Sequence, residues 1–225
     1  MALADIQALV DNLVRDTSGT IASTERDRAI GLAVQRYSTD RPRLEVIDVT
    51  AAGGQSIDMP EGWIAGFSRL VAVEQPAGEV PPAIWPDDTW RLYQGPAATV
   101  IHLARSVAAG ASARLTITMP HMVSAEVDTI PAPDREAVAC WAAALLLDQL
   151  AAAFSGDKIS TIQAEVANPV SKGAEYAKRA AAARARYFAE LGLDARRNAP
   201  ASATVEFTPR DDAGRRRLFH PGPMA

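Results

Sequence analysis

The sequence has only one cysteine, Cys140, and three histidines among its 225 residues. A single cysteine cannot form a disulfide within the chain, so the sequence permits a reducing compartment. Cys140 lies in an apolar segment, where cysteine usually serves as a small buried hydrophobe. His102, His121 and His220 are far apart in the sequence and no H-E-x-x-H pattern is present, so we expect no metal site.

The signatures of common enzyme classes are missing as well. The sequence has no G-x-x-x-x-G-K-[ST] loop, no G-x-G-x-x-G pattern after a predicted strand and no G-x-S-x-G elbow. Asp87 and Asp88 form the one adjacent acidic pair in the part expected to fold, and between Pro86 and Thr89 they indicate a turn rather than a catalytic cleft. We therefore expect no catalytic site, no cofactor and no enzymatic activity.

Long apolar runs are also absent. The longest, 137–147, falls short of the roughly 20 residues that a membrane-spanning helix needs. Asp5 and Asp11 near the N-terminus do not fit a secretory signal. The sequence therefore predicts no membrane association and a protein that stays in the cytoplasm until it is assembled into something.

The composition is that of an ordinary globular protein, with 48% hydrophobic and 22% charged residues. Its length suits one or two domains of about 100 to 200 residues each. The net charge of −4 argues against a chain that wraps nucleic acid, because such chains usually carry a basic excess. Residues 194–225 hold six arginines and four acidic residues, a net +2, so the remainder carries −6. An acidic body thus precedes a basic tail.

Two apolar helices are predicted in the second half of the chain. The first covers 134–154, between Pro131 and Gly156, which suit the start and the end of a helix. The second covers 171–191, and a connector between them favours an antiparallel pair. The apolar face of the first is predicted to comprise Val138, Trp141, Ala142, Leu145, Leu146 and Gln149. We expect the core of the pair to include Val138, Trp141, Leu145, Tyr187 and Phe188.

Two more helices are predicted before residue 42, the second with Ser23 or Thr24 as its N-cap. Their apolar stripes comprise Ile6, Leu9, Val10, Leu13 and Val14, and Ile30, Ala33, Val34 and Tyr37. From 44 to 119 the pattern changes to period two, with turn residues between short runs, which predicts about five to six antiparallel strands. The expected domains are a helical part (1–41 and 121–192), an inserted β-module (42–120) and a C-terminal arm (193–225).

Two groups of side chains have alternative interpretations. The aromatic residues of the β-module could stack on bases or sugars, but core packing and interface anchoring are favoured; they are Trp63, Phe67, Trp85, Trp90 and Tyr93. The basic residues of the last helix could contact phosphate, but a solvated face or a subunit contact is favoured because acidic residues interrupt them. They are Lys172, Lys178, Arg179, Arg184 and Arg186.

Residues 134–191 resemble the C-terminal helices of the head-to-tail connector, or adaptor, proteins of tailed bacteriophages and phage-like particles. The resemblance is carried by AALLLDQL at 143–150, SGD at 155–157, SKGAEYAKRA at 171–180 and RARY at 184–187. It is weaker over the first forty residues, and the β-module matches only by its position. The fold class that the resemblance implies is α+β, a four-helix adaptor-type bundle with an inserted antiparallel β-module and an extended C-terminal tail.

The resemblance also implies a function. Adaptors of this kind form a ring, usually dodecameric, below the portal and join the capsid to the tail. The expected partners are other copies of the chain, the portal protein, a stopper or tail-completion protein, and double-stranded DNA that passes through the ring without sequence-specific binding. The expected location is the neck of the virion. A modestly acidic body suits such a channel, because like charge avoids phosphate binding.

The arm is expected to dock on the portal or on a neighbouring subunit. The residues assigned to this role are Val205, Phe207, Arg210, Arg215, Arg216, Arg217, Leu218 and Phe219. Residues 205–208 could add a strand to an exposed sheet edge. The alternative function is that of a DNA-binding or DNA-packaging protein that uses its basic helix and its arginine-rich tail.

Overall fold

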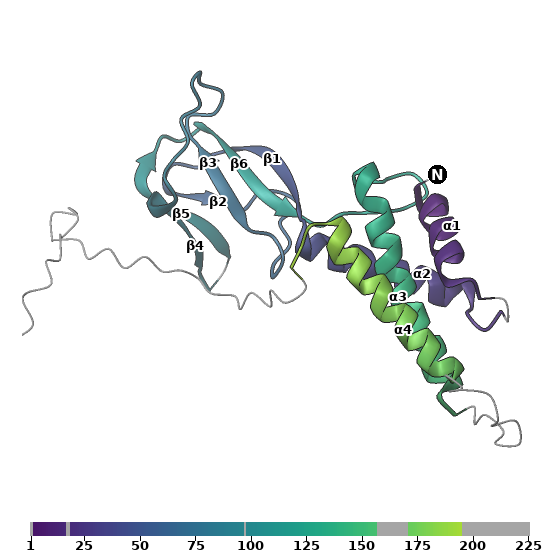
Figure 1. The fold of residues 1–225 in the computed structure, drawn as a ribbon. Coiled ribbons are helices and arrows are strands. Elements are labelled where there is room, and N and C mark those ends of the chain that lie inside the picture. Colours follow the sequence, from purple (N-terminus) through teal and green to yellow (C-terminus); the bar gives the residue numbers. More distant parts are fainter. Residues whose placement is uncertain (1, 17–18, 97, 157–170, 195–225) are drawn as a thin grey trace, which may run out of the picture. The chain divides into compact units, whose positions relative to one another are not determined.

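The computed structural model describes residues 2–16, 19–96, 98–156 and 171–194 (Figure 1). The chain divides into two units, Met1–Leu193 and Asp194–Ala225, and the first contains every described helix and strand. The helices are α1 (Ala2–Val14), α2 (Ser23–Asp40), α3 (Arg135–Ala153) and α4 (Lys172–Glu190). The strands are β1 (Arg43–Thr50), β2 (Gly54–Asp58), β3 (Leu70–Glu74), β4 (Trp90–Gln94), β5 (Thr99–Val107) and β6 (Ser112–Met119).

The fold class expected from the sequence, a four-helix adaptor-type bundle with an inserted β-module, is wrong. The described residues form an α+β protein with four helices and two three-stranded antiparallel sheets. The strands enclose a hydrophobic core of their own, which includes Val73, Leu103 and Leu115. A second, separate core belongs to the helices. Because the strands form two sheets with a core of their own, a four-helix bundle does not describe the fold.

Helix α3 is the centre of the helical part. It contacts α1, α2 and α4, whereas α1 and α2 contact each other much less. The sequence predicted one buried face, but α3 is buried on most sides because alanine allows its neighbours to approach closely on each of them. Trp141 and Leu145 are only partly buried and Gln149 is exposed. The buried residues are Ala137, Val138, Ala139, Cys140, Ala142, Ala143, Ala144, Leu146, Leu147 and Leu150.

The C-terminal end of α2 is joined to α3 and α4 by two hydrogen bonds from buried tyrosines. The Tyr37 hydroxyl donates to the Asp134 carboxylate, just before α3, at 2.6 Å. The Tyr187 hydroxyl of α4 donates to the Asp40 carboxylate of α2, also at 2.6 Å. Arg41 donates to the carbonyl oxygen of Leu191 at 2.6 Å. The last turn of α2 thereby positions the start of α3 and the end of α4.

The six strands form two sheets with the orders β1-β6-β3 and β2-β5-β4. All pairs are antiparallel, and β1 runs opposite β6 from Arg43 opposite Met119 to Thr50 opposite Ser112. Side chains alternate along β1, so that Ile47 and Val49 pack against the core while the residues between them point outward. The inner faces of both sheets contribute to this core, through residues that include Ile57, Ile101 and Ile117.

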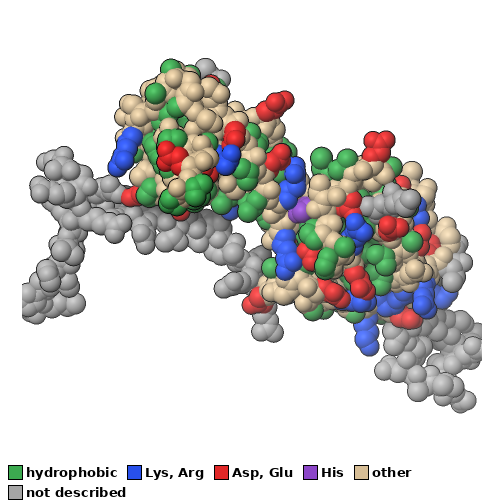
Figure 2. All heavy atoms as spheres, turned by 90° about the horizontal axis from the view of Figure 1, so that it is seen from above, with side chains coloured by type: hydrophobic (Ala, Val, Ile, Leu, Met, Phe, Trp, Pro, Cys, Tyr) green, Lys and Arg blue, Asp and Glu red, His purple; other side chains and the backbone are tan. Residues whose placement is uncertain are grey.

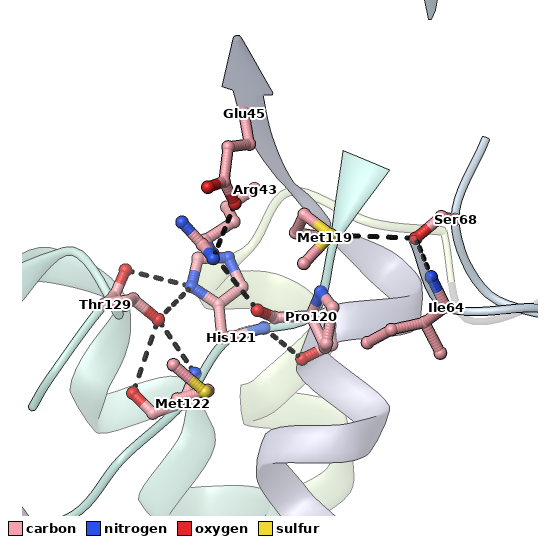
Figure 3. A network of polar contacts seen from close by, with 10 residues as sticks. Arg43, Glu45, Ile64, Ser68, Met119, Pro120, His121, Met122 and Thr129 are labelled. Atoms are coloured by element: carbon pink, nitrogen blue, oxygen red, sulfur yellow. Dashed lines mark hydrogen bonds and ion pairs between the residues drawn. The ribbon is translucent and has the colours of Figure 1, made fainter. Parts of the chain in front are cut away.

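A polar network lies where the chain enters β1 and leaves β6 (Figure 3). The backbone N–H of His121 donates to the Ser38 hydroxyl of α2 at 2.9 Å, and ring atom Nε2 of His121 lies 3.0 Å from the carbonyl oxygen of Arg41. Arg43 donates to the carbonyl oxygen of Pro120 at 3.2 Å. The two passages between helices and strands are therefore held side by side.

Candidate functional site

The residues expected to dock on the portal or on a neighbour lie outside the described part of the chain. They are Val205, Phe207, Arg210, Arg215, Arg216, Arg217, Leu218 and Phe219. The described unit presents three other surface features that could take a partner. These are an apolar sheet face, a hydrogen-bonded hairpin and a groove between helices.

The five residues expected in the helical core differ in burial. Val138 and Tyr187 are fully buried. Trp141, Leu145 and Phe188 are partly buried and pack against the core from its edge. The Trp141 ring lies 4.9 Å from the Tyr187 ring and 5.8 Å from the Phe188 ring, measured between centroids. These aromatic residues therefore close the outer seam between α3 and α4.

The outer face of the β1-β6-β3 sheet carries exposed apolar side chains. Leu44 and Val46 on β1 are 60% and 58% exposed, and Val71 on β3 is 44% exposed. Leu44 lies opposite Thr118 and Val46 opposite Thr116 on β6, which separates β1 from β3. We call Leu44 and Val46, which lie on one face of β1, the apolar sheet face; Val71 lies beyond β6, at a break in the pairing of β3 with β6. Adjacent exposed apolar side chains of this kind commonly mark a protein contact.

The opposite end of the same sheet is ionic. The Arg114 guanidinium donates through Nε and Nη2 to the two carboxylate oxygens of Asp48, at 2.7 and 2.9 Å. These hydrogen bonds lower the pKa of Asp48. The Glu74 carboxylate lies 3.8 Å from Arg114 on its other side. These charges are paired with one another, so the apolar sheet face is the part of this surface that lacks complementary contacts within the described chain.

The second feature is the hairpin formed by residues 75–85, between β3 and β4. It presents Val80, which is 95% exposed, and Ile84, which is 63% exposed. Its two arms are joined by backbone hydrogen bonds from Gln75 to Ala83 (3.0 Å) and from Trp85 to Val73 (2.8 Å). These bonds hold the hairpin in one conformation while its tip remains in solvent.

The base of the hairpin is braced further. The Trp85 indole Nε1 donates to the Gln75 carbonyl oxygen at 2.9 Å, and the Ala77 N–H donates to Ser112 at the start of β6 at 3.1 Å. The Gly78 N–H donates to the carboxylate of Glu74 at 2.7 Å. The exposed tip, 79–82, is thus carried on an ordered base.

The third feature is a groove of about 240 Å³ between α1, α3 and α4. Its floor is formed by Cys140, Ala143 and Leu147 of α3, and Ala182 and Ala183 of α4 form one wall. Burial raises the pKa of the Cys140 thiol, so this side chain is a neutral apolar group at neutral pH. We call this feature the α4 groove.

Arg179 forms part of the rim of the α4 groove and also closes the end of α1. Its guanidinium donates to the carbonyl oxygens of Leu13 and Val14 at 3.0 and 2.9 Å. The last carbonyl groups of a helix have no partner within the helix, so an arginine placed there satisfies them. The Tyr176 ring centroid also lies 5.6 Å from this guanidinium. Carbonyl oxygens and an aromatic ring carry no formal charge, so in the part of the chain that the structure describes Arg179 has no ionic partner.

Two other arginines of α4 form ion pairs with acidic residues. Arg184 pairs with Asp148 of α3, and Arg186 pairs with Glu136 of α3 and with Glu190 of its own helix. These contacts hold α4 against α3. The basic row that the sequence suggested as a possible phosphate contact is therefore largely used inside the helical part.

The other residues weighed in the sequence are not gathered into a catalytic or metal site in the described ranges. Asp87 and Asp88 begin a 3-10 turn, η1 (Asp87–Thr89), as their flanking residues indicated. Trp63, Trp85 and Trp90 pack against the β core, and Tyr93 is 52% exposed. Within those ranges no three residues of the His, Cys, Asp or Glu types are placed to hold a metal ion.

A cavity of about 530 Å³ lies beside the connection between α1 and α2. Arg26 lines it and forms ion pairs with Asp11 and Asp27, at 2.8 and 3.5 Å. Asp16 accepts a hydrogen bond from the Ile21 N–H at 2.8 Å. Its charged groups are thus engaged in joining α1 to α2, and they offer no obvious reactive pair.

By length and composition, the segment Ala132–Gly156, which contains α3, is apolar enough to cross a membrane, although the longest uninterrupted apolar run is shorter than a span. More than half of its most apolar stretch is buried among the other elements. The core helix of a folded body passes the same test, so this segment is weak support for a membrane span. No known family model matches the chain, and no curated protein matches it significantly.

Proposed function

We propose that this chain is a structural head-to-tail adaptor of a tailed bacteriophage or a phage-like particle. Its copies form a dodecameric ring below the portal, join the capsid to the tail and surround the DNA channel. The observation that carries the proposal is the apolar sheet face, where Leu44 and Val46 are exposed on the same face of β1 in the single chain. Covering this face with protein removes apolar area from water, which favours association.

The charge distribution supports a channel rather than a DNA-binding surface. The chain carries a net −4, and two arginines of α4 already pair with carboxylates of the same chain. On the face shown in Figure 2, acidic and basic side chains lie among one another. A surface of this kind attracts phosphate weakly, so DNA can slide past it. The type of particle and the neighbours, portal and stopper or tail-completion protein, follow from the resemblance of residues 134–191 to adaptor helices. The proposal includes no catalytic activity.

Sedimentation and negative-stain electron microscopy of the purified full-length protein, alone and mixed with the portal of the same particle, test the proposal. We expect ring-shaped assemblies in at least one of the two samples. A chain that remains monomeric in both samples at micromolar concentration contradicts it. Retention on double-stranded DNA that weakens steeply with salt would instead favour the DNA-binding alternative.

Substitution of the apolar sheet face connects this test to the observation. The double variant Leu44→Asp/Val46→Asp should keep the fold, because both side chains point into solvent, but should lose assembly. Thr50→Asp is a matched control, since Thr50 is exposed on the same face of the same strand. Rings that form equally well with the double variant and with the control would show that this face is not the contact.

A further inference from the structure

The tip of the 75–85 hairpin is arranged as an apolar knob. Val80 is the most exposed large hydrophobic residue of the described chain, and it is followed by Pro81 and Pro82, which are also exposed. The base is fixed by the hydrogen bonds described above, so little conformational freedom remains to be lost when the tip is covered. An ordered loop that exposes an apolar side chain is suited to insertion into a cavity.

The α4 groove has the properties that such a knob requires. Its floor of Cys140, Ala143 and Leu147 is apolar and buried, and the accessible apolar lining is provided by Leu13, Ala182 and Ala183. Its volume of about 240 Å³ is of the size of a few side-chain groups rather than a cofactor.

The charges of the two features are complementary. Glu79 precedes Val80 at the tip and is exposed. On the groove side, Arg179 contacts carbonyl oxygens of α1 and the Tyr176 ring, and within the described residues it forms no ion pair with a carboxylate. When the tip enters the groove, the Glu79 carboxylate next to Val80 therefore approaches the Arg179 guanidinium next to the apolar floor.

We propose that the tip of the 75–85 hairpin of one copy seats in the α4 groove of a second copy, with Val80 over the floor and Glu79 beside Arg179. The inference rests on the proposed ring, since it names a contact between neighbouring subunits in addition to the one proposed at the apolar sheet face. The tip and the groove are different surfaces of one chain, so the contact is heterologous. Each pairing leaves one tip and one groove open, and such contacts continue from copy to copy until the ring closes.

Disulfide trapping tests this contact in the full-length chain. Cys140→Ala removes the native thiol, and Val80→Cys with Ala182→Cys then places one new thiol on the tip and one on the groove wall. Copper-phenanthroline in air oxidises thiol pairs whose Cα atoms come within about 7 Å. We expect a ladder of covalent multimers beyond the dimer on non-reducing gels, which collapses to monomer on reduction.

The single-thiol variants separate a heterologous contact from random collisions. Val80→Cys alone and Ala182→Cys alone, in the Cys140→Ala background, can form nothing larger than a dimer. A mixture of these two variants should give a heterodimer. Ala108→Cys, on the exposed turn between β5 and β6, is the matched control for Val80→Cys. Paired with Ala182→Cys, it should give no ladder.

The outcomes distinguish the contact from the proposed function. Rings without a ladder, or a ladder as strong from Ala108→Cys as from Val80→Cys, overturn the contact and leave the ring intact. A chain that is monomeric with and without portal overturns the ring and the contact together. Val80→Asp provides an independent readout, because it should keep the melting temperature and reduce the assembled fraction at least tenfold.

Discussion

At the scale of single residues, the helical part depends on two tyrosine–carboxylate–arginine groups. Asp134 accepts from Tyr37 and pairs with Arg41 at 3.0 Å. Asp40 accepts from Tyr187 and pairs with Arg36 at 2.7 Å. Burial, followed by the hydrogen bond to the carboxylate, raises the pKa of both tyrosines. The charged tyrosinate is thus disfavoured in the folded chain.

These pKa shifts predict loss of stability in alkali. Below about pH 10 the tyrosines are neutral in both states, so their contribution is fully present. Above it the unfolded chain ionises first, and the free energy of unfolding should fall by up to about 1.4 kcal/mol per pH unit for each tyrosine. Tyr37→Phe/Tyr187→Phe should flatten this fall while costing about 1 to 3 kcal/mol per site at neutral pH.

Urea unfolding between pH 8 and 11 measures the effect. The Cys140→Ala background is needed because burial also raises the pKa of that thiol, which acts in the same direction. An equal alkaline fall with and without the two tyrosine hydroxyls would show that these pairs do not cause it.

Trp141 provides a second residue-scale prediction. It is partly buried between Tyr187 and Phe188, with the Arg36 guanidinium 5.0 Å from its ring centroid. Replacement of a fully buried tryptophan by alanine costs about 3 to 5 kcal/mol, so Trp141→Ala should cost less, about 2 to 3 kcal/mol. Val80→Ala, at an exposed apolar position, should change stability by less than about 0.5 kcal/mol. Chemical denaturation compares the two, and similar losses would contradict the assignment of Trp141 to the seam.

At the scale of elements, the two ends of the strand-rich segment are held together. His121 contacts the carbonyl oxygen of Arg41 and the hydroxyl of Ser38, so the chain leaves β6 where it entered β1. A few residues of linker can therefore replace everything between Pro42 and Pro120, since each extended residue spans about 3.3 Å. The helical core contains no residue from β1 to β6.

Replacement of residues 43–119 by a short Gly/Ser linker should consequently leave a folded helical protein. Circular dichroism should show a helical spectrum with cooperative thermal unfolding. The same deletion combined with His121→Ala is a useful companion, because it removes the side-chain contact that joins the two ends and should melt at a lower temperature. A non-cooperative melt of the first variant would mean that the strands are needed to hold the helices.

Local signals in the sequence predict the helix positions well. The segments predicted over 134–154 and 171–191 agree within one residue with α3 and α4, because proline, glycine and capping residues mark their ends. The start of α2 was less predictable. Ser23 or Thr24 was expected to cap it, but Ala22 is the N-cap, and the Glu25 carboxylate accepts from the Ala22 N–H at 2.9 Å. The side chain that caps this end of α2 is therefore that of Glu25, three residues after the N-cap, and not that of Ser23 or Thr24.

The fold class was not predictable because it depends on pairing between distant segments. Period two indicates strands around Leu44 and Val46, but both faces of β1 carry apolar residues, so the pattern does not tell which face is buried. Only the pairing of β1 with β6 and the packing of Ile47 and Val49 decide it. The α4 groove could not be predicted from the sequence either, since it is formed by three helices that lie far apart along the chain.

At the scale of the whole molecule, the described unit and the arm are expected to have separate roles. The unit contains both hydrophobic cores, and the arm begins after Leu193. The arm is the basic part of an otherwise acidic chain, with six arginines against four acidic residues in 194–225. Arginine suits attachment because its planar fork can pair in two ways with a carboxylate.

Deletion of residues 195–225 should leave the unit folded but abolish stable attachment to the portal. Particles made with this variant should be DNA-filled heads that lack tails or leak, as counted by electron microscopy and by DNA release. A fourfold substitution of Arg210, Arg215, Arg216 and Arg217 by serine should have the same effect. Normal particles would exclude the arm as an attachment, and heads that fail at packaging would favour the DNA-binding alternative.

The guanidinium of Arg179 on the last carbonyls of α1 has a consequence for synthesis on the ribosome. Helix α1 is synthesised well before Arg179, which satisfies its last carbonyl groups, and also before α3, which supplies its other core partners. The strands from 43 to 119 depend on no later segment for their core. Chains emerge from the ribosome N-terminus first. On stalled nascent chains, the β-module should therefore be the first part to become resistant to protease. Helices α1 and α2, although synthesised before it, should be among the last elements to fold.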